Sequence, residues 1–385
     1  MKKLIILGCT GSIGQTALKA LENDKSPIEI VGLSAYTKLN KLLEIAKKFS
    51  VKTIATPLAD VEFIQRAKSL NIKVFTSIED MIVATESDLV LNGIAGTAGL
   101  KSSIATLSSE KDLALANKES IVMAGKLLKE LAKNKNKKIF PVDSEHSCLA
   151  ELIQAHGKDN VDKLFITASG GPFRNYSLSQ LEKITPLQAS NHPTWKMGKK
   201  ISIDSSTLAN KALEIIEASI LFDFPPTKIE PIINPTSQVH SLIGLKNGQT
   251  YAQISQPNMT FPIMNAIYKA FNYSYELSPP TSIFSFLGKG LKLEFYPLDQ
   301  KRFPMIRLGF ECLNSSKASP IVFNAANEVA VNKFCLGEIN FLQIPILVED
   351  VLIKMGSQNQ TQTFEEIFEI DRKTREIGEK LSKTL

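Results

Sequence analysis

The sequence predicts an α/β protein in three parts: an N-terminal doubly wound parallel sheet, a central α+β region and a C-terminal helical region. Three observations predict it. Short apolar runs alternate with helical patterns up to about residue 142, strand-like runs gather between residues 143 and 275, and the pattern beyond residue 305 is almost entirely helical. A βαβα rhythm favours parallel strands covered by helices, whereas clustered strands favour a mixed or antiparallel sheet.

Seven short apolar runs are expected to form the first sheet. Helical patterns such as 39–49 and 121–133 lie between them, as crossover connections between parallel strands require. The expected strands are Lys3–Leu7, Ile28–Leu33, Thr53–Ala55, Val74–Phe75, Asp88–Leu91, Leu113–Ala116 and Lys138–Val142.

The rest of the chain is divided where the hydrophobic pattern and the Pro, Ser and Gly content change. The central region is expected to hold helices at 145–156 and 206–222 and strands at 163–169, 229–233, 239–245 and 250–254. A segment rich in Pro, Ser and Gly then connects it to helices at 306–313, 320–334, 342–354 and 363–382. The predicted divisions are 1–142, 143–275, a connection at 276–304, and 305–385.

Composition excludes several classes of protein. The 385 residues are 43% hydrophobic and 22% charged, which is an ordinary globular balance, and no stretch approaches the roughly 20 apolar residues of a membrane span. The net charge of +6 is scattered, so we expect phosphorylated small substrates rather than nucleic acid. Four cysteines without a CxxC pair indicate thiols in a reducing cytoplasm.

A glycine-rich turn, Gly8-Cys-Thr-Gly-Ser-Ile-Gly14, follows the first expected strand and opens a helix. Glycines let the backbone approach a pyrophosphate, and the helix N-terminus favours its negative charge. The spacing is GxxGxxG, which is weak by itself, and the alternative is a plain strand-to-helix turn. The strand–turn–helix context favours a dinucleotide in a Rossmann-type unit.

The end of the second strand indicates which dinucleotide is bound. Sites that prefer NAD usually carry an acidic residue there, whereas this chain has Tyr36, Thr37 and Lys38. Lys38 at this position favours the 2′-phosphate of NADP(H), although an exposed lysine without this role is the commoner case.

Two carboxylates, Asp143 and Glu145, stand where the expected strand 138–142 ends. Side chains two apart on an extended chain point the same way, and open α/β sheets bind ligands at the carboxyl ends of strands. Such a pair needs a proton or a cation between its members, and Mg²⁺ or Mn²⁺ suits oxygen ligands. The alternative is a solvated turn in which Asp143 or Ser144 caps a helix.

Further polar residues gather at predicted helix starts. Lys118 is a candidate donor to substrate oxygens, and Glu119 is either functional or a favourable first-turn acid. Asn210, Lys211 and Glu214 suit a phosphate and a third metal carboxylate, or else form an exposed polar face.

Three other segments contain residues that could serve either function or structure. The loop around 191–200 holds His192 and the single tryptophan, Trp195, and is either a closing lid or a loop anchored by a buried ring. Ser169, in a glycine-rich turn after a strand, is a candidate anion ligand. Asn324-Ala-Ala-Asn-Glu328 is expected to serve helix packing rather than chemistry.

Together these segments resemble the 1-deoxy-D-xylulose 5-phosphate reductoisomerase family along nearly the whole chain. The resemblance rests on the order and spacing of six segments. They are GCTGSIG (8–14), LANKES (115–120), PVDSEH (141–146), TASGGPFR (167–174), HPTWKMGKKISIDSSTLANKALEIIEA (192–218) and NAANE (324–328).

The resemblance implies a role for each candidate residue. The NADPH contacts would be Thr10, Gly11, Ser12, Ile13, Asn117, Glu119 and Gly198. The ligands of Mg²⁺ or Mn²⁺ would be Asp143, Glu145 and Glu214. The sugar end would meet Lys118, Ser144, Glu145 and His192, and the phosphate would meet Ser169, Ser205, Asn210 and Lys211. Trp195 and Met197 would belong to a flap at about 191–200.

The resemblance also implies a reaction: metal-assisted rearrangement of a linear ketose phosphate, then hydride transfer from NADPH, to give 2-C-methyl-D-erythritol 4-phosphate in the non-mevalonate isoprenoid pathway. Lys118, Glu145, His192 and Glu214 would be the catalytic residues, and the central domain would form a homodimer. Two positions depart from the family pattern, Tyr36-Thr37-Lys38 and Asn258-Met259-Thr260. A dinucleotide-binding protein without turnover and a metal-independent sugar dehydrogenase are the alternatives.

Overall fold

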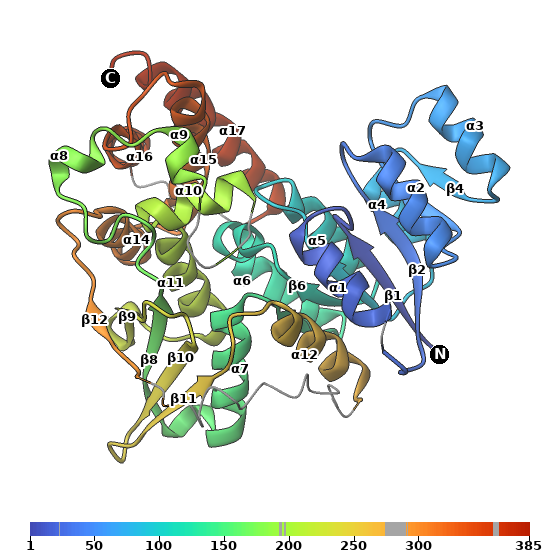
Figure 1. The fold of residues 1–385 in the computed structure, drawn as a ribbon, viewed down its shortest axis with the longest axis horizontal. Helices are drawn as coiled ribbons and strands as arrows, with labels where there is room; N and C mark the ends of the chain where they lie inside the picture. The colour runs from blue at the N-terminus through green and yellow to red at the C-terminus, as the bar shows by residue number, and fades with distance from the viewer. Residues whose placement is uncertain (23, 192–194, 196–197, 274–289, 291, 357–361) are drawn as a thin grey trace. The chain divides into compact units, whose positions relative to one another are not determined.

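The computed structural model describes residues 1–22, 24–191, 195, 198–273, 290, 292–356 and 362–385 (Figure 1). The chain forms two compact units. Unit 1 comprises Met1–Ser120, Leu128–Ser147 and Asn258–Glu276, and unit 2 comprises Ile121–Leu127, Cys148–Pro257 and Leu277–Leu385. Within the described residues, no helix is both long and apolar enough to cross a membrane.

Unit 1 is built on a parallel sheet of seven strands in the order β4-β3-β2-β1-β5-β6-β7. The strands are β1 Lys2–Leu7, β2 Ile28–Ser34, β3 Thr53–Ala55, β4 Lys73–Phe75, β5 Leu89–Asn92, β6 Asp112–Leu115 and β7 Ile139–Pro141. The chain starts in the middle, winds to one edge and then crosses to the other, so the strand order reverses between β1 and β5. The predicted doubly wound sheet is confirmed, and such a reversal is where these sheets bind ligands.

Helices cover both faces of this sheet. They are α1 Ser12–Glu22, α2 Leu39–Lys48, α3 Val61–Ser69, α4 Ile78–Ala84, α5 Gly99–Ser108 and α12 Thr260–Phe271. Helix α6 Lys118–Asn134 is divided between the units, with Ile121–Leu127 counted in unit 2. Strand β1 shows why two faces are needed. Leu4 and Ile6 pack into one apolar cluster, Ile5 and Leu7 into another, and all four are fully buried. A parallel strand buried on both faces is a continuous apolar run, as Leu4–Leu7 is.

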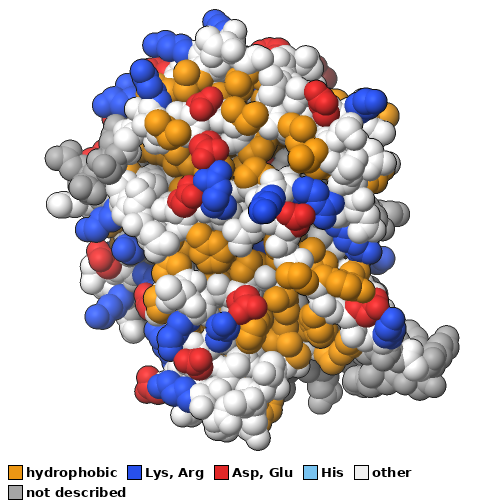
Figure 2. Space-filling view, turned by 90° about the vertical axis from the view of Figure 1, so that its left-hand side faces the viewer, with side chains coloured by type: hydrophobic (Ala, Val, Ile, Leu, Met, Phe, Trp, Pro, Cys, Tyr) orange, Lys and Arg blue, Asp and Glu red, His pale blue; other side chains and the backbone are white. Residues whose placement is uncertain are grey.

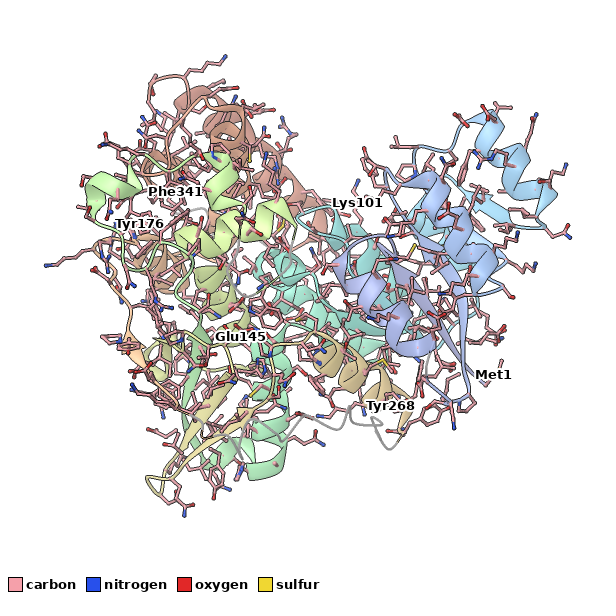
Figure 3. The ribbon with its side chains drawn as sticks, in the orientation of Figure 1. Met1, Lys101, Glu145, Tyr176, Tyr268 and Phe341 are labelled. Carbon is pink, nitrogen blue, oxygen red and sulfur yellow. The ribbon has the colours of Figure 1, made fainter. Side chains whose placement is uncertain are left out.

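Helix α12 belongs to unit 1 although it lies more than a hundred residues beyond β7. Its residues Ile263, Met264 and Ile267 join the cluster that contains Leu4 and Ile6. Tyr268 lies near the end of this helix (Figure 3). Its hydroxyl donates a hydrogen bond to Asp24 Oδ2 at 2.6 Å. Burial, reinforced by this bond, raises the pKa of Tyr268 to about 12, so the hydroxyl keeps its proton at neutral pH.

Unit 2 contains a mixed sheet of five strands in the order β11-β10-β8-β9-β12. The strands are β8 Val161–Ala168, β9 Ile229–Ile233, β10 Val239–Leu245, β11 Thr250–Ile254 and β12 Tyr296–Pro297. Strands β8 and β9 pair in parallel, and the other pairs are antiparallel. The sequence therefore predicts the central α+β region correctly.

The helices of unit 2 pack beside this sheet and in a C-terminal group. They are α7 Ser144–His156, whose first residues count in unit 1, then α8 Leu178–Leu181, α9 Pro186–Ala189, α10 Lys199–Thr207, α11 Ala209–Phe222, α14 Met305–Asn314, α15 Ser319–Leu336, α16 Gln343–Met355 and α17 Phe364–Leu381. Helix α15 buries residues around its whole circumference, which is typical of a central helix. On the face drawn in Figure 2, charged side chains of both signs are interspersed with apolar ones.

The single helix predicted over 206–222 is wrong, because the structure breaks it at Leu208. This residue adopts the left-handed conformation, with φ at 62°, and so ends α10 and precedes α11. Thr207 Oγ1 accepts a hydrogen bond from Ala209 N at 3.3 Å across the break. A left-handed conformation costs a non-glycine residue roughly 1–2 kcal/mol. The break changes the direction of the chain between Ser205 and Asn210.

Candidate active site

The glycine-rich turn between β1 and α1 has no room for a side chain at Gly8 or Gly14. Gly8 has φ at +68°, and a Cβ there would lie 2.9 Å from the carbonyl oxygen of Gly93. A Cβ on Gly14 would lie 2.5 Å from Cys9 Cα. Gly11 N donates to Gly8 O at 2.9 Å and closes the turn. The backbone from Thr10 to Ile13 therefore stands at the N-terminus of α1, where a phosphate is favoured.

The end of β2 holds this turn in place. Gly8 N donates to Ser34 Oγ at 3.1 Å, and Cys9 N donates to Ser34 O at 2.8 Å. Burial raises the pKa of the Cys9 thiol to about 12, which makes it a packing group rather than a nucleophile. Beyond Ala35 the chain becomes exposed, and Lys38 is exposed just before α2.

Asn117 and Glu119 form a buried network at the start of α6. Asn117 Oδ1 accepts from Ser120 N at 3.0 Å and so caps the helix. Its Nδ2 donates to Gly96 O at 2.8 Å and to Glu119 Oε2 at 2.9 Å. The two predicted cofactor residues therefore also shape the loop that follows β5.

The carboxylates Asp143 and Glu145 lie just after β7. One carboxylate oxygen of Asp143 lies within 4.8 Å of one of Glu145, which is close for two anions. Lys118, which is 5% exposed, forms an ion pair with Asp143, and Ser144 Oγ donates to Glu145 Oε2 at 2.5 Å. Lys118 supplies the positive charge that this cluster requires.

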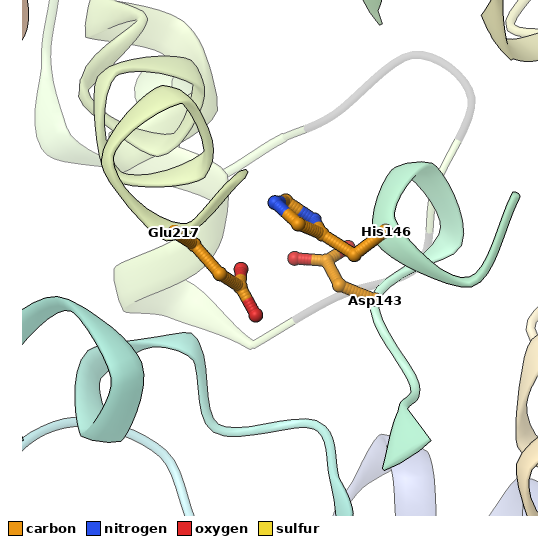
Figure 4. Close-up of side chains that lie close together, drawn as sticks. All are labelled: Asp143, His146 and Glu217. Carbon is orange, nitrogen blue, oxygen red and sulfur yellow. The ribbon is translucent and has the colours of Figure 1, made fainter. Parts of the chain in front are cut away.

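The geometry of the pair differs from the sequence argument. We expected an extended chain through Glu145, but α7 begins at Ser144, so Ser144 and Glu145 lie in its first turn. Figure 4 shows Asp143 and His146 at this turn. The carboxylates approach each other because the chain coils there, not because alternate strand residues share a face.

A second polar site lies within unit 2, after β8. Gly170 and Gly171 have φ at +85° and +71°, and Gly171 N donates to Ser169 Oγ at 3.2 Å. A Cβ on Gly171 would lie 2.8 Å from the carbonyl oxygen of Ser205. The glycine therefore allows the Ser169 turn to pack against α10 beside Ser205. The structure brings together two of the four predicted phosphate ligands.

The other two predicted phosphate ligands open α11. Asn210 Nδ2 donates to Glu214 Oε1 at 2.5 Å, and Lys211 forms an ion pair with the other oxygen of Glu214. Glu214 is 1% exposed, so its charge needs these partners. Glu217 follows one turn later on α11, also buried (Figure 4). The predicted i, i+4 relation of Asn210 and Glu214 is confirmed.

The predicted flap lies largely outside the described residues. His192, Lys196 and Met197 are among those not described. Trp195 is half-buried, and Gly198 is exposed at the N-cap of α10, with open space where a Cβ would lie.

Two buried polar residues that hold neighbouring segments together were not predicted from the sequence. Asn92, at the end of β5, donates to Gly99 O and Ser103 Oγ, both at 2.9 Å. Asp204, on α10, accepts from Asn327 Nδ2 at 2.8 Å. Asn92 heads the glycine-rich segment Asn92–Gly99, which was a readable signal, whereas Asp204 and Asn327 are too far apart in sequence to be paired by inspection.

The fold defines a class of protein: an oxidoreductase with a Rossmann-type dinucleotide-binding unit and a second unit built on a mixed sheet. Family models place the chain more narrowly. The model of 1-deoxy-D-xylulose 5-phosphate reductoisomerase matches residues 4–125, and two models of the C-terminal domains of this enzyme match residues 139–222 and 254–377. The chain belongs to the 1-deoxy-D-xylulose 5-phosphate reductoisomerase family.

Individual members of this family are similar in sequence to this chain over nearly its full length. The chain is 41% identical to the 1-deoxy-D-xylulose 5-phosphate reductoisomerase of Treponema denticola, covering 98% of this chain and 96% of the relative. It is 38% identical to that of Clostridium kluyveri, covering all of both chains.

Solved structures of the family also match over the whole chain. One is a crystal structure of DOX-P reductoisomerase in complex with NADPH, fosmidomycin and magnesium, with 32% identity and a TM-score of 0.92, covering 100% of this chain and 98% of that one. Another is the Zymomonas mobilis enzyme in complex with NADPH, with 34% identity and a TM-score of 0.89, covering 100% of both chains.

Proposed function

We propose that this protein rearranges and reduces 1-deoxy-D-xylulose 5-phosphate to 2-C-methyl-D-erythritol 4-phosphate, using NADPH and Mg²⁺ or Mn²⁺, in the non-mevalonate isoprenoid pathway. The observation that carries the proposal is the pair Asp143 and Glu145 after β7, with oxygens within 4.8 Å of each other and Lys118 beside them. Relatives named for this reaction share the fold over the full length.

The residues present fit a divalent cation. Asp143, Glu145 and Glu214 would hold it, because carboxylate oxygens are the ligands that Mg²⁺ and Mn²⁺ prefer. When bound, the cation supplies Lewis acidity to the vicinal oxygens of the ketose. Lys118 and Lys211 now pair with two of these carboxylates. Because a bound cation would neutralise part of the carboxylate charge, the ammonium groups of Lys118 and Lys211 would then be able to donate hydrogen bonds to substrate oxygens.

The residues around the first turn fit NADPH. The space at Gly8 and Gly14 admits only backbone, which lets the pyrophosphate approach the N-terminus of α1. The backbone and side chains of the turn would hold the phosphates, with further contacts beyond it. The proposed residues are Thr10, Gly11, Ser12, Ile13, Lys38, Asn117, Glu119 and Gly198. The dinucleotide supplies the hydride.

The substrate would be held at both ends. Ser169, Ser205, Asn210 and Lys211 would bind its phosphate, and Lys118, Ser144, Glu145 and His192 its sugar oxygens. Holding a linear sugar at two ends fixes its reacting carbons and lowers the entropic part of the barrier. Trp195 and Met197 would then cover the substrate and exclude water.

An NADPH-oxidation assay tests the proposal. Oxidation is expected only when 1-deoxy-D-xylulose 5-phosphate and a divalent metal are both present, and EDTA is expected to abolish it until Mg²⁺ or Mn²⁺ is restored. Turnover that survives EDTA would instead identify a metal-independent dehydrogenase. Binding of NADPH without turnover under any of these conditions would identify a binding protein.

The assembly and compartment are part of the same proposal: a cytoplasmic homodimer. None of the four cysteines, all of which the structure describes, forms a disulfide. Reduced thiols accord with a reducing compartment. Light scattering after size-exclusion chromatography measures the mass directly. Twice the 42.4 kDa of one chain is expected, and a single-chain mass would refute the dimer.

A further inference from the structure

A buried hydrogen bond joins two helices of unit 2 beside the predicted phosphate ligands. Asp204 of α10 is 1% exposed, and its Oδ1 accepts from Nδ2 of Asn327, which is fully buried on α15. The other oxygen, Oδ2, pairs with Lys200 Nζ at 3.0 Å, one turn earlier on α10. Asn327 belongs to the segment that the sequence assigned to helix packing alone.

The chemistry of this contact is unusual for packing. A buried carboxylate is costly unless it is paired and hydrogen-bonded, and apolar residues of similar size often stabilise a core at least as well. A charge-assisted hydrogen bond, however, fixes distance and direction more narrowly than apolar contact does. The Asp204–Asn327 bond therefore fixes the position of α10 against α15.

The position of α10 matters because Ser205, a predicted phosphate ligand, directly follows Asp204. Successive residues on a helix point about 100° apart, so Asp204 can face α15 while Ser205 faces elsewhere. Ser205 contributes the carbonyl oxygen that lies 2.8 Å from the Cβ position of Gly171, in the Ser169 turn. A displacement of Asp204 would move Ser205 relative to Ser169.

The Ser169 turn is also tied to α15. Phe173, three residues after Gly170, packs edge-on against Phe341 at 5.6 Å between ring centroids. Phe341 in turn packs against Phe334 of α15 at 5.9 Å, and Figure 3 shows Tyr176 and Phe341 on this side of unit 2. Both elements that carry the predicted phosphate ligands Ser169 and Ser205 are thus anchored on one helix.

We propose that Asn327 is a positioning residue for the phosphate end of the substrate. Acting through Asp204, it fixes α10 so that Ser205 stands at the right distance from the Ser169 turn. This inference rests on the proposed function, because it takes the anion at this site to be the substrate phosphate.

Four variants test the role. Asn327→Leu removes the donor at nearly constant size, and Asn327→Asp places a second carboxylate against Asp204. The double variant Asp204→Asn with Asn327→Asp exchanges amide and carboxylate and restores a hydrogen bond between the helices. Asn324→Leu is the matched control, because Asn324 is equally buried on α15 and its Nδ2 donates to Met123 Sδ at 3.5 Å, whereas Asn327 Nδ2 donates to Asp204.

The measurements are kcat, the KM for the ketose phosphate and for NADPH, calorimetric titration with inorganic phosphate, and thermal unfolding. Asn327→Leu is expected to lower the affinity for inorganic phosphate and raise the KM for the ketose phosphate, each by about tenfold. This is the effect expected for the loss of a hydrogen bond to a charged group, and the KM for NADPH is expected to stay unchanged. Asn327→Asp is expected to weaken them at least as much, and the exchange variant to recover most of the loss. Asn324→Leu is expected to keep the parent's phosphate affinity even where it lowers the melting temperature.

Two results would overturn the role: an active Asn327→Leu enzyme with the parent's KM and phosphate affinity, or an equal loss in Asn324→Leu. If Asn327→Leu does not fold, Asn327→Ser, which is too short to reach Asp204, makes the same comparison. A parent that neither turns over the ketose phosphate nor binds phosphate would overturn the proposed function and this role together. A normally active parent with an unaffected Asn327 variant overturns the positioning role alone.

Discussion

Replacing Gly171 by alanine is expected to push the Ser169 turn away from α10 by a distance that the structure gives. The new methyl group would stand 2.8 Å from the carbonyl oxygen of Ser205, whereas ordinary contact begins near 3.4 Å. The Ser169 turn and α10 must therefore separate by about 0.6 Å, the difference between these two distances. Misplacement by 1 Å costs about a hundredfold in rate, so a loss of about tenfold in kcat/KM is expected.

The substitution also strains the backbone, and this effect needs a separate control. Gly171 has φ at +71°, which costs a residue with a side chain roughly 1–2 kcal/mol. Gly248, in the turn between β10 and β11, has φ at +86° and open space where its Cβ would lie. Gly248→Ala therefore carries the same kind of backbone strain in the same unit without pushing on α10.

The assay compares the two variants by urea unfolding and by steady-state kinetics. Both are expected to lose roughly 1–2 kcal/mol of stability, and only Gly171→Ala is expected to lose kcat/KM for the ketose phosphate. Parental kcat/KM in Gly171→Ala would refute the reasoning, because it would show that the approach to Ser205 does not set the site. An equal kinetic loss in Gly248→Ala would show that strain alone explains the effect.

Three further substitutions test the remaining roles. Glu214→Gln keeps the shape but removes a charge, so metal-dependent turnover should fall at least about a hundredfold while NADPH binding by fluorescence stays nearly intact; normal Mn²⁺ titration would exclude the three-carboxylate site. Lys38→Ala should lower the NADPH/NADH ratio of kcat/KM by no more than about fivefold, because exposed charge pairs are worth only ~0.2–1 kcal/mol, and an unchanged ratio would discard its role. Trp195→Ala should reduce turnover with little change in melting temperature, whereas a large drop in melting temperature would indicate a buried anchor.

Local signals in the sequence were sufficient for β1 to β11, but β12 Tyr296–Pro297 lies in the segment 276–304 that was expected to be only a connection. The apolar runs predicted at 53–55, 229–233, 239–245 and 250–254 match the observed strands residue for residue, because each run is short and bounded by polar or turn-forming residues. The glycine-rich turn was equally readable, since the structure requires glycine at Gly8 and Gly14 for steric reasons.

Three features of the structure could not be predicted from the sequence, each for a physical reason. The break at Leu208 lies inside a segment whose pattern predicts one helix, and leucine gives no sign of a left-handed conformation. The helix expected from residue 145 begins at Ser144, and strand β7 ends at Pro141, so Asp143 and Glu145 are not alternate residues of one extended segment. The Asp204–Asn327 bond joins residues 123 apart, and no periodicity reports a contact of that kind.

The placement of α12 has a consequence for the order in which the protein is made. The apolar cluster around Leu4 and Ile6 is completed by Ile263, Met264 and Ile267, which leave the ribosome long after β7. Between Ser147, where unit 1 is interrupted, and Phe271, where α12 ends, 124 more residues must be synthesised (271 minus 147). At about 5–20 residues per second this takes roughly 6–25 s. During that interval the part of the nascent sheet against which α12 packs, strands β5 to β7, lacks this cover, so the newly made N-terminal segment needs protection from aggregation until α12 is made.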